Sequence, residues 1–279
     1  RIISLISNWG ESSVLKCQDI ENKLVDKAFY LAQSLSTQCR LVNVAIILTI
    51  CLVIKCKKTE KKTNRPVLLF ASDTQESSSY LKSPVTKLRA IYGKTPKKHK
   101  SEWGILVASA GDALVIDEVL SDIEDFLRDE IEPNCNNPSV QLELLRKEIG
   151  DVAYQTYNKY ENRKSKDPHF TLLLGAADEF STILYITCEG KQQILPQFGV
   201  IGRGRVTGGE LLLREFLRED IDQKEAARLA ALIITRIGNV DISVGGEPDM
   251  KWCRNRRIRH YSETTYKDII DEAESRWNS

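Results

Sequence analysis

The chain has 279 residues, of which 42% are hydrophobic and 28% are charged, a composition typical of ordinary globular proteins. This length predicts one large domain or two small ones. The formal net charge is +1, which excludes a strong overall field toward nucleic acid or a membrane surface. Basic residues cluster at 55–65, 94–100 and 254–259. We interpret these clusters as solvated loops rather than phosphate-binding patches, because no aromatic residues interleave the first two.

The cysteines and histidines show no metal-binding pattern. Seven cysteines are scattered without a CxxC pair, and the three histidines lie far apart in the sequence. We therefore expect no metal site and no cofactor. Reduced thiols fit a cytoplasmic protein, or a nuclear one if the source is eukaryotic.

The first 48 residues differ from the rest of the chain. Residues 21–35 have helical spacing, and residues 41–54 form a nearly continuous apolar run. That run is shorter than the roughly 20 residues that a membrane span needs, so a buried strand is preferred to a signal anchor. We expect residues 1–48 to be an N-terminal extension or propeptide, and residues 49–279 to form the folded domain.

Strands and helices alternate in blocks along this domain. Short apolar segments predict strands at 49–56, 67–73, 85–92, 103–110, 170–177, 183–188, 192–201, 240–244 and 249–254. Amphipathic patterns predict helices at 112–131, 138–160, after 207, after 222 and at 266–277. Because helices come in pairs between blocks of strands, the order favours antiparallel sheets covered by helices, an α+β domain, over a doubly wound parallel sheet.

Capping signals mark several helix ends. Asn137 before Pro138 predicts an N-cap. The segments Thr207–Glu210 and Asp222–Glu225 have the spacing of capping boxes. Gly238 is the predicted end of the helix that follows Asp222.

Six short segments resemble one protein family in order and approximate spacing. They are residues 49–55, 70–75, 82–88, 108–112, 201–204 and 241–246. Together they resemble a proteasome β-type subunit, an N-terminal-nucleophile (Ntn) hydrolase, and they are also similar to the peptidase subunit of the bacterial two-component ATP-dependent protease. The resemblance implies a four-layer αββα sandwich of two antiparallel sheets between helix layers, with a proteasome-type Ntn-hydrolase domain over residues 49–279.

The resemblance also implies a threonine nucleophile. Thr49 would be freed at the N-terminus by self-cleavage, with Lys87 supplying positive charge beside it and Asp73 pairing that lysine. A threonine hydroxyl needs a base to become a nucleophile, and a free α-amine with an ordinary pKa near 8 can serve. A buried ammonium without a partner is unfavourable, so the Lys87 ammonium would need the Asp73 carboxylate as its partner.

Two further positions complete the implied site. Asp241 would orient the terminal amine, and the backbone N–H of Gly111 would stabilise the tetrahedral oxyanion. Taken singly, each of these residues also fits an ordinary strand or turn position. Cys51 is another conceivable nucleophile, but it is interior to its strand and no histidine partner is apparent.

Three positions depart from the family pattern. Leu48 precedes Thr49, where self-processing members have a glycine that eases the strained backbone. Arg203 and Val244 stand where the family has serines, and Ser243 would replace the second of these.

The sequence therefore predicts a threonine-type endopeptidase subunit of a proteasome-like ring. Its expected partners are other subunits of the ring and unfolded polypeptide substrates, with neither nucleic acid nor membrane. Two alternatives stay open. One is a non-catalytic structural subunit of a similar ring that retains residues 1–48, and the other is a small-molecule amidohydrolase of the same fold.

Overall fold

The computed structural model describes residues 49–57, 65–77, 82–84, 86–94, 102–131, 137–161, 169–261, 267–272 and 275. All of them belong to the compact unit Val44–Ser279. The predicted N-terminal extension at 1–48 lies outside the described residues. The predicted final helix is described over 267–272, which are helical.

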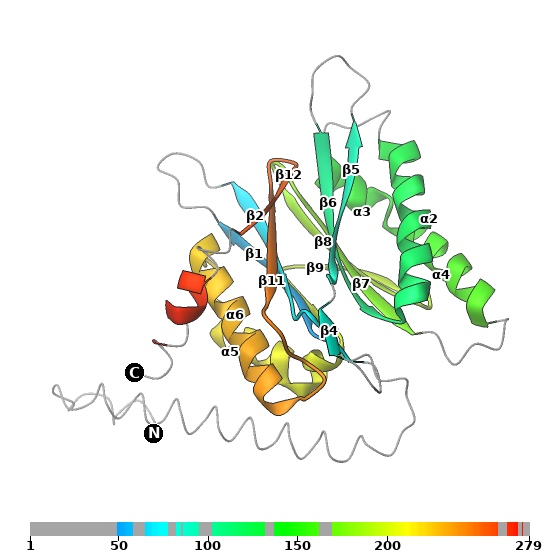
Figure 1. Ribbon diagram of the computed structural model, residues 1–279. Helices are drawn as coiled ribbons and strands as arrows, with labels where there is room; N and C mark the ends of the chain where they lie inside the picture. Colours follow the sequence, from blue (N-terminus) through cyan, green and yellow to red (C-terminus); the bar gives the residue numbers. More distant parts are fainter. Residues whose placement is uncertain are drawn as a thin grey trace, which may run out of the picture. The chain divides into compact units, whose positions relative to one another are not determined.

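The first sheet has five antiparallel strands in the order β10-β1-β2-β11-β12. Figure 1 labels β1, β2, β11 and β12 of this sheet. Its strands are β1 (Cys51–Lys57), β2 (Pro66–Ser72), β10 (Phe198–Ile201), β11 (Asp249–Arg254) and β12 (Arg257–His260). The central strand β2 is apolar on both faces, because Leu68 and Phe70 lie in the core between the sheets while Val67, Leu69 and Ala71 lie in the core under α6.

The second sheet also has five antiparallel strands, in the order β5-β6-β7-β8-β9, and a separate hairpin joins β3 to β4. These strands are β3 (Gln75–Ser77), β4 (Lys82–Pro84), β5 (Leu88–Lys94), β6 (Glu102–Gly111), β7 (Phe170–Ala177), β8 (Ser181–Thr187) and β9 (Gln192–Leu195). The β3–β4 hairpin is absent from the sequence-based prediction.

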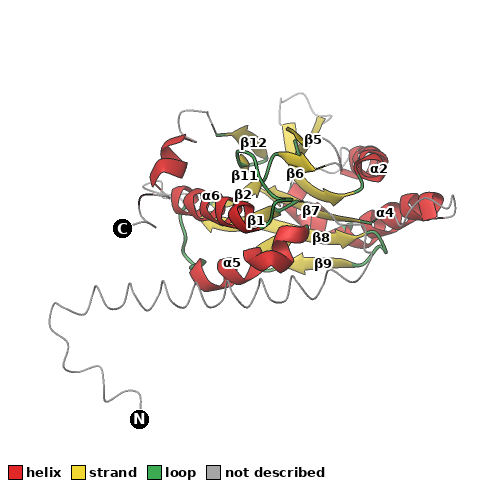
Figure 2. Cartoon of the chain, turned by 60° about the horizontal axis from the view of Figure 1, so that its bottom comes forward, coloured by secondary structure: helices red, strands yellow, loops and turns green. Residues whose placement is uncertain are grey.

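Helices cover the outer face of each sheet. They are α2 (Ala113–Ile131), α3 (Pro138–Leu144) and α4 (Arg146–Glu161) on the second sheet, and the π-helix η3 (Arg205–Gly209), α5 (Glu210–Phe216) and α6 (Gln223–Val240) by the first. Apolar cores fill the space between the sheets and under each helix layer. Figure 2 shows the strands between the α5–α6 layer and the α2–α4 layer. The predicted αββα sandwich of Ntn-hydrolase type is confirmed.

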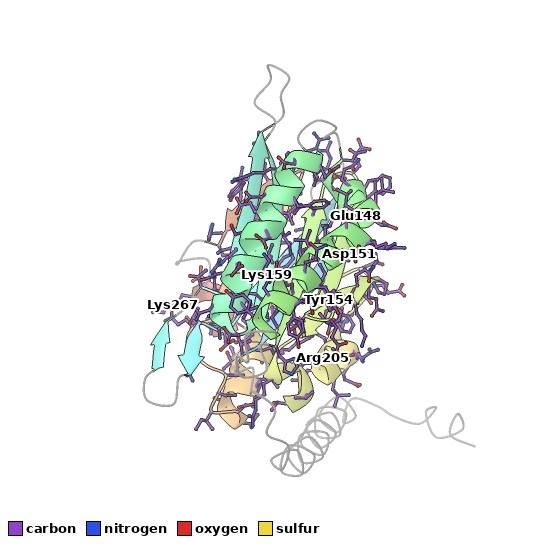
Figure 3. All side chains as sticks on the ribbon, turned by 90° about the vertical axis from the view of Figure 1, so that its right-hand side faces the viewer. Glu148, Asp151, Tyr154, Lys159, Arg205 and Lys267 are labelled. Atoms are coloured by element: carbon purple, nitrogen blue, oxygen red, sulfur yellow. The ribbon has the colours of Figure 1, made fainter. Side chains whose placement is uncertain are left out.

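Helix α4 presents a polar outer face. Glu148, Asp151 and Tyr154 follow one another along it and are exposed (Figure 3). Ile149 and Ala153, between them in the sequence, are fully buried against the second sheet. This division between faces is the amphipathic pattern that predicted the helix. Within the described part of the chain, no helix has the length and apolar character needed to cross a membrane.

The single helix predicted over 138–160 is instead two helices with a turn at Leu145. Asn137 occupies the N-cap position as predicted, but its side chain makes no capping hydrogen bond. The carboxylate of Asp178 accepts the Ser139 backbone N–H at 2.9 Å and its hydroxyl at 2.7 Å. The partner for this helix start therefore lies 39 residues further along the chain.

The two predicted capping boxes have different outcomes. The one at Thr207–Glu210 is wrong, because Thr207 lies inside η3, which runs directly into α5. The one at Asp222–Glu225 is confirmed in its first half, since the Asp222 carboxylate accepts the Glu225 N–H at 2.8 Å and caps α6.

Three strand and helix boundaries also differ from the prediction. Helix α6 continues past Gly238 to Val240, so the strand predicted at 240–244 is wrong and a loop follows the helix from Asp241. Residues 192–201 form two strands in different sheets, separated at Pro196, which has no N–H to donate to a ladder. Strand β12 follows a two-residue turn at Asn255 and Arg256, whose φ angles of 51° and 67° suit a tight hairpin.

Candidate active site

The carboxylate of Asp73 lies at one end of the first sheet, beside Thr49. Asp73 directly follows β2, and Thr49 lies two residues before β1, so the antiparallel pairing brings both to the same edge. The Thr49 hydroxyl donates to Oδ1 of Asp73 at 2.5 Å, and the Ile50 N–H donates to the same oxygen at 2.8 Å. Asp73 is 0% exposed and Thr49 is 4% exposed. The hydroxyl is therefore held in one orientation within a dry environment.

Lys87 binds the other oxygen of the same carboxylate. Its Nζ donates to Oδ2 of Asp73 at 2.8 Å and to the carbonyl of Gln75 at 2.7 Å. The backbone N–H of Gly245 donates to Oδ2 at 3.3 Å. The two carboxylate oxygens thus receive four donors, which fills the acceptor sites of a carboxylate. The structure brings Thr49, Asp73 and Lys87 together, with Asp73 bridging the other two.

Cys51 lies next to this cluster, but its thiol is unreactive. Its thiol is fully buried and donates to the Ser109 carbonyl at 3.4 Å. Burial, and secondarily the negative charge of Asp73, raise the pKa of Cys51 to about 12. The thiol stays protonated at neutral pH, and a protonated thiol is not a nucleophile. This chemistry disfavours the alternative in which Cys51 attacks the substrate.

Gly111 ends β6, on the strand that lies beside Lys87. Its φ is +143°, and a Cβ there would lie 2.3 Å from the carbonyl oxygen of His169, so only glycine fits. Ser109, two residues earlier, donates its N–H to the Lys87 carbonyl at 3.2 Å. No described contact joins Gly111 itself to Thr49, and its role in stabilising an oxyanion stays a prediction.

Asp241 forms the centre of a second cluster, just after α6. Its Oδ1 accepts both the N–H of Ser243, at 3.1 Å, and the Ser243 hydroxyl. Its Oδ2 accepts Nε of Arg203 at 2.8 Å and the hydroxyl of Thr207 at 2.9 Å. Burial opposes ionisation most strongly, but the Ser243 and Thr207 hydrogen bonds and the Arg203 guanidinium together lower the pKa of Asp241. The carboxylate is therefore ionised at neutral pH.

The turn that carries Arg203 packs against the backbone of Thr49. Gly204 donates its N–H to the Thr49 carbonyl at 3.0 Å. Gly202 has a φ of +84°, and a Cβ at this position would lie 2.3 Å from that same carbonyl oxygen. Glycine at 202 is thus required for the close approach of the two backbones. Arg203 lies between these two glycines in the sequence, so its backbone is held close to Thr49, the candidate nucleophile.

The loop after α6 connects the two clusters. Asp241 at its start binds Arg203, and Gly245 near its end binds Asp73. Gln75 fixes the middle of the loop, because its Nε2 donates to the Ile242 carbonyl at 3.0 Å and its N–H donates to the Gly245 carbonyl at 2.9 Å. A pocket of about 280 Å³ lies along this loop, between Gln75 and the last turn of α6.

Sequence reasoning missed four contributors to this geometry. The backbones of Gln75, Gly204 and Gly245 and the hydroxyl of Thr207 all bind site residues. Gly204 and Gly245 lie within recognised segments, but a backbone donor leaves no mark of its own in a sequence. The sequence places Thr207 at a helix cap, because its spacing from Glu210 is that of a capping box.

No arrangement of metal ligands accompanies the two clusters. Over the ranges that the structure describes, no group of three or more His, Cys, Asp or Glu side chains lies together as a metal ion requires.

Solved structures with a similar fold are Anbu proteins. The ancestral beta-subunit Anbu from Yersinia bercovieri is 16% identical, with 83% of this chain and 97% of that chain covered and a TM-score of 0.61. Anbu from Hyphomicrobium sp. strain MC1 is 18% identical, with 82% and 95% covered and a TM-score of 0.59. The helical assembly of the Anbu complex from Pseudomonas aeruginosa matches at 15% identity, with 82% and 94% covered and a TM-score of 0.62.

Comparison of the sequence gives no family. No family model matches the chain, and no curated protein matches it. The assignment to the proteasome β-type subunits, or to the peptidase subunit of the bacterial two-component protease, is therefore wrong at the level of the family. The structural neighbours are Anbu proteins, and at 15% to 18% identity they show the Ntn sandwich fold alone. Short motifs set by strand ends and turns reflect the shared fold, and they do not distinguish one family with this fold from another.

Proposed function

We propose that this protein is a threonine-type peptidase whose nucleophile is the Oγ of Thr49. The observation that carries the proposal is the chain of contacts from the Thr49 hydroxyl through the Asp73 carboxylate to the Lys87 ammonium, with distances of 2.5 and 2.8 Å. A nucleophile oriented by a second group that is itself held by a third is the usual arrangement in covalent catalysis. Removal of the residues before Thr49 would supply a terminal amine as the base.

The chemistry follows from these groups. The Oγ of Thr49 attacks the amide carbon while its proton passes to the neutral terminal amine. Collapse of the tetrahedral intermediate breaks the C–N bond, and the departing amine takes that proton. Water then hydrolyses the Thr49 ester, which returns the hydroxyl and releases the acid. The Lys87 ammonium favours the negative charge that develops near Oγ, and Asp73 keeps this ammonium in place.

A non-catalytic subunit is the main alternative. It is favoured by Leu48, which lacks the backbone freedom of the glycine in self-processing proteins. It is also favoured by the burial of Thr49, which is 4% exposed. This alternative predicts that the bond after Leu48 stays intact in the purified protein.

A small-molecule amidohydrolase is the second alternative. The pocket beside the site is about 280 Å³ in volume. This is slightly below the usual range for pockets that enclose a small ligand, which begins at about 300 Å³. None of Thr49, Asp73 and Lys87 lines this pocket, so its volume does not distinguish a peptide from a small amide, and turnover assays with both classes of substrate discriminate between them.

Association with other subunits forms part of the proposal. The matching structure from Pseudomonas aeruginosa is described as a helical assembly of a complex. By analogy, we propose that this chain also works as a subunit of a larger assembly, with unfolded polypeptides as substrates.

A covalent probe tests the proposed nucleophile. The full chain is incubated with a peptide β-lactone, which acylates reactive threonine hydroxyls, and the adduct is located by mass spectrometry of proteolytic fragments. We expect an adduct on Thr49, and on serine in the Thr49→Ser variant. The nearly isosteric Thr49→Val variant should give no adduct and should not degrade a reduced, alkylated protein substrate. Equal labelling or degradation by Thr49→Val would contradict the proposal.

A further inference from the structure

Both oxygens of the Asp241 carboxylate are already engaged. Three donors bind it alone, the Ser243 N–H and hydroxyl at Oδ1 and the Arg203 Nε at Oδ2, while the Thr207 hydroxyl shares its single hydrogen between Oδ2 and the Arg203 carbonyl. An ionised carboxylate offers about four lone-pair sites. The expectation that Asp241 orients the terminal amine stays a prediction, and Arg203 already occupies one of the acceptor places that an amine would use.

Hydrogen bonds at its backbone and side chain hold Arg203 beside Asp241. Its carbonyl accepts the Thr207 hydroxyl at 3.1 Å, and Nε donates to Asp241 at 2.8 Å. The flanking residues Gly202 and Gly204 both touch the Thr49 carbonyl. The side chain is 27% exposed, while that of Asp241 is 5% exposed. The Arg203 guanidinium therefore neutralises the nearly buried Asp241 carboxylate, next to the turn that contacts Thr49.

We propose that Arg203 is a positioning residue that occupies Asp241 and so leaves the terminal amine of Thr49 without an anionic partner. This inference rests on the proposed function, because that function creates the amine. An ammonium group gains from a neighbouring carboxylate, and the gain favours its protonated form. With Asp241 occupied, the amine stays neutral to lower pH and remains available as the base.

Among the described residues, the titratable groups near Thr49 leave no unpaired charge. Those groups are Cys51 from β1, Asp73 after β2, Lys87 before β5, Arg203 before η3 and Asp241 after α6. Asp73 is paired with Lys87, and Asp241 is paired with Arg203. The Cys51 thiol is protonated. Each carboxylate of the site thus already has its own cation, and loss of Arg203 exposes one of the two negative charges.

The experiment measures the pH dependence of Thr49 acylation. The full chain is purified, its N-terminus is sequenced, and the rate of labelling by the peptide β-lactone is followed by intact mass between pH 5 and 9. The wild type is compared with Arg203→Gln, which keeps the length but loses the charge, and with Arg203→Lys, which keeps the charge. The double variant Arg203→Gln with Asp241→Asn removes both charges. Arg203→Ser is the second neutral variant if Arg203→Gln does not mature.

We expect the acidic limb of the rate profile to move upward by about one pH unit in Arg203→Gln, because the uncovered carboxylate favours the ammonium form. The limb should stay in place in Arg203→Lys, and it should return toward the wild-type position in the double variant. A merely structural role for Arg203 would lower the rate at every pH and leave the limb where it is.

The outcomes separate this inference from the proposed function. If Thr49 is processed and labelled while Arg203→Gln keeps the wild-type limb, the role of Arg203 is overturned and the peptidase proposal stands. A shift in Arg203→Lys as large as that in Arg203→Gln also overturns the role of the charge. A chain that is never processed and never labelled overturns both, and the N-terminal sequence shows this before any profile is measured.

Discussion

Asp73 and Asp241 are two buried carboxylates in one site, each hydrogen-bonded at both oxygens and paired with one cation. They differ in what surrounds them. Asp73 is 0% exposed and its cation, Lys87, is 10% exposed, whereas the cation of Asp241, Arg203, is 27% exposed. The first carboxylate binds the candidate nucleophile directly, and the second reaches it only through the turn at Gly202 and Gly204.

The difference shows that similar hydrogen bonding serves two purposes. At Asp73 the ion pair is buried and sets the position of the Thr49 hydroxyl, the candidate nucleophile. At Asp241 the ion pair fixes a turn and a helix end, and it removes a negative charge from the vicinity of Thr49. The two carboxylates should therefore respond differently to substitution and to pH.

The largest effect is expected from Asp73→Asn. The change leaves the Lys87 ammonium nearly buried and without its partner charge, which typically lowers the free energy of unfolding by about 3 to 5 kcal/mol. Urea denaturation measures this loss. The matched control is Asp117→Asn, which breaks the surface pair between Asp117 and Arg89, with side chains 55% and 46% exposed. The control should change stability by less than about 1 kcal/mol, and equal effects would contradict this account of Asp73.

A smaller loss is expected from Gly202→Ala, which disturbs the contact between the Arg203 turn and Thr49. The new Cβ would meet the Thr49 carbonyl oxygen at 2.3 Å, in a backbone with φ of +84°. We expect a loss of about 2 to 3 kcal/mol in the free energy of unfolding. Gly208→Ala is the control, because its φ is +127° but its nearest contact is Ile237 at 3.7 Å. A loss in the control as large as in Gly202→Ala would mean that backbone strain alone, and not the close approach, explains the glycine.

The Asp241→Asn variant should show a pH-dependent loss of about 1 to 3 kcal/mol. Because the folded state lowers the pKa of Asp241, the ionised carboxylate contributes stability that is fully present above its unfolded pKa near 4. This contribution is lost as the pH falls below 4 toward the folded pKa. The stability difference between wild type and variant, measured by urea denaturation at pH 7, 5, 4 and 3, should therefore shrink below pH 4. A difference that grows on acidification would show that the sign of the effect is wrong.

The smallest effect is expected at Cys51, which burial keeps protonated with a pKa of about 12. Iodoacetamide at pH 8 should not modify Cys51 in the folded protein, and peptide mapping would detect the modification. The same reaction in 6 M guanidinium chloride is the control, in which Cys51 should react. Rapid alkylation of Cys51 in the folded state would reopen the alternative of a cysteine nucleophile.

Much of the fold and the Asp73 cluster followed from sequence patterns, for a physical reason. Apolar strands with polar residues at their ends place those residues at the edge of a sheet once the pairing is antiparallel. Thr49 and Asp73 meet in this way, and Lys87 precedes the adjoining strand β5. The strand ends are short-range features that a single sequence contains, whereas the family resemblance is what singled out Thr49, Asp73 and Lys87.

The Asp241 cluster was less predictable, because it depends on how helix ends meet in space. Thr207 has the capping-box spacing from Glu210, but in the structure it lies inside η3 and its hydroxyl binds Asp241, 34 residues further along the chain. Helix α6 continues past Gly238 to Val240, and the Asp241 N–H closes its last turn on the Ile237 carbonyl. The ion pair between Arg203 and Asp241 joins residues 38 positions apart and carries no local signal.

The N-terminal sequence of the mature protein tests the central claim most directly. The full chain is expressed, purified and subjected to N-terminal sequencing and intact-mass measurement, with Thr49→Val processed in parallel. We predict a wild-type chain that begins at Thr49 and a Thr49→Val chain that retains the preceding residues. A wild-type chain that keeps Leu48 and yet hydrolyses peptides would contradict the account, because Thr49 would then have no terminal amine to serve as its base.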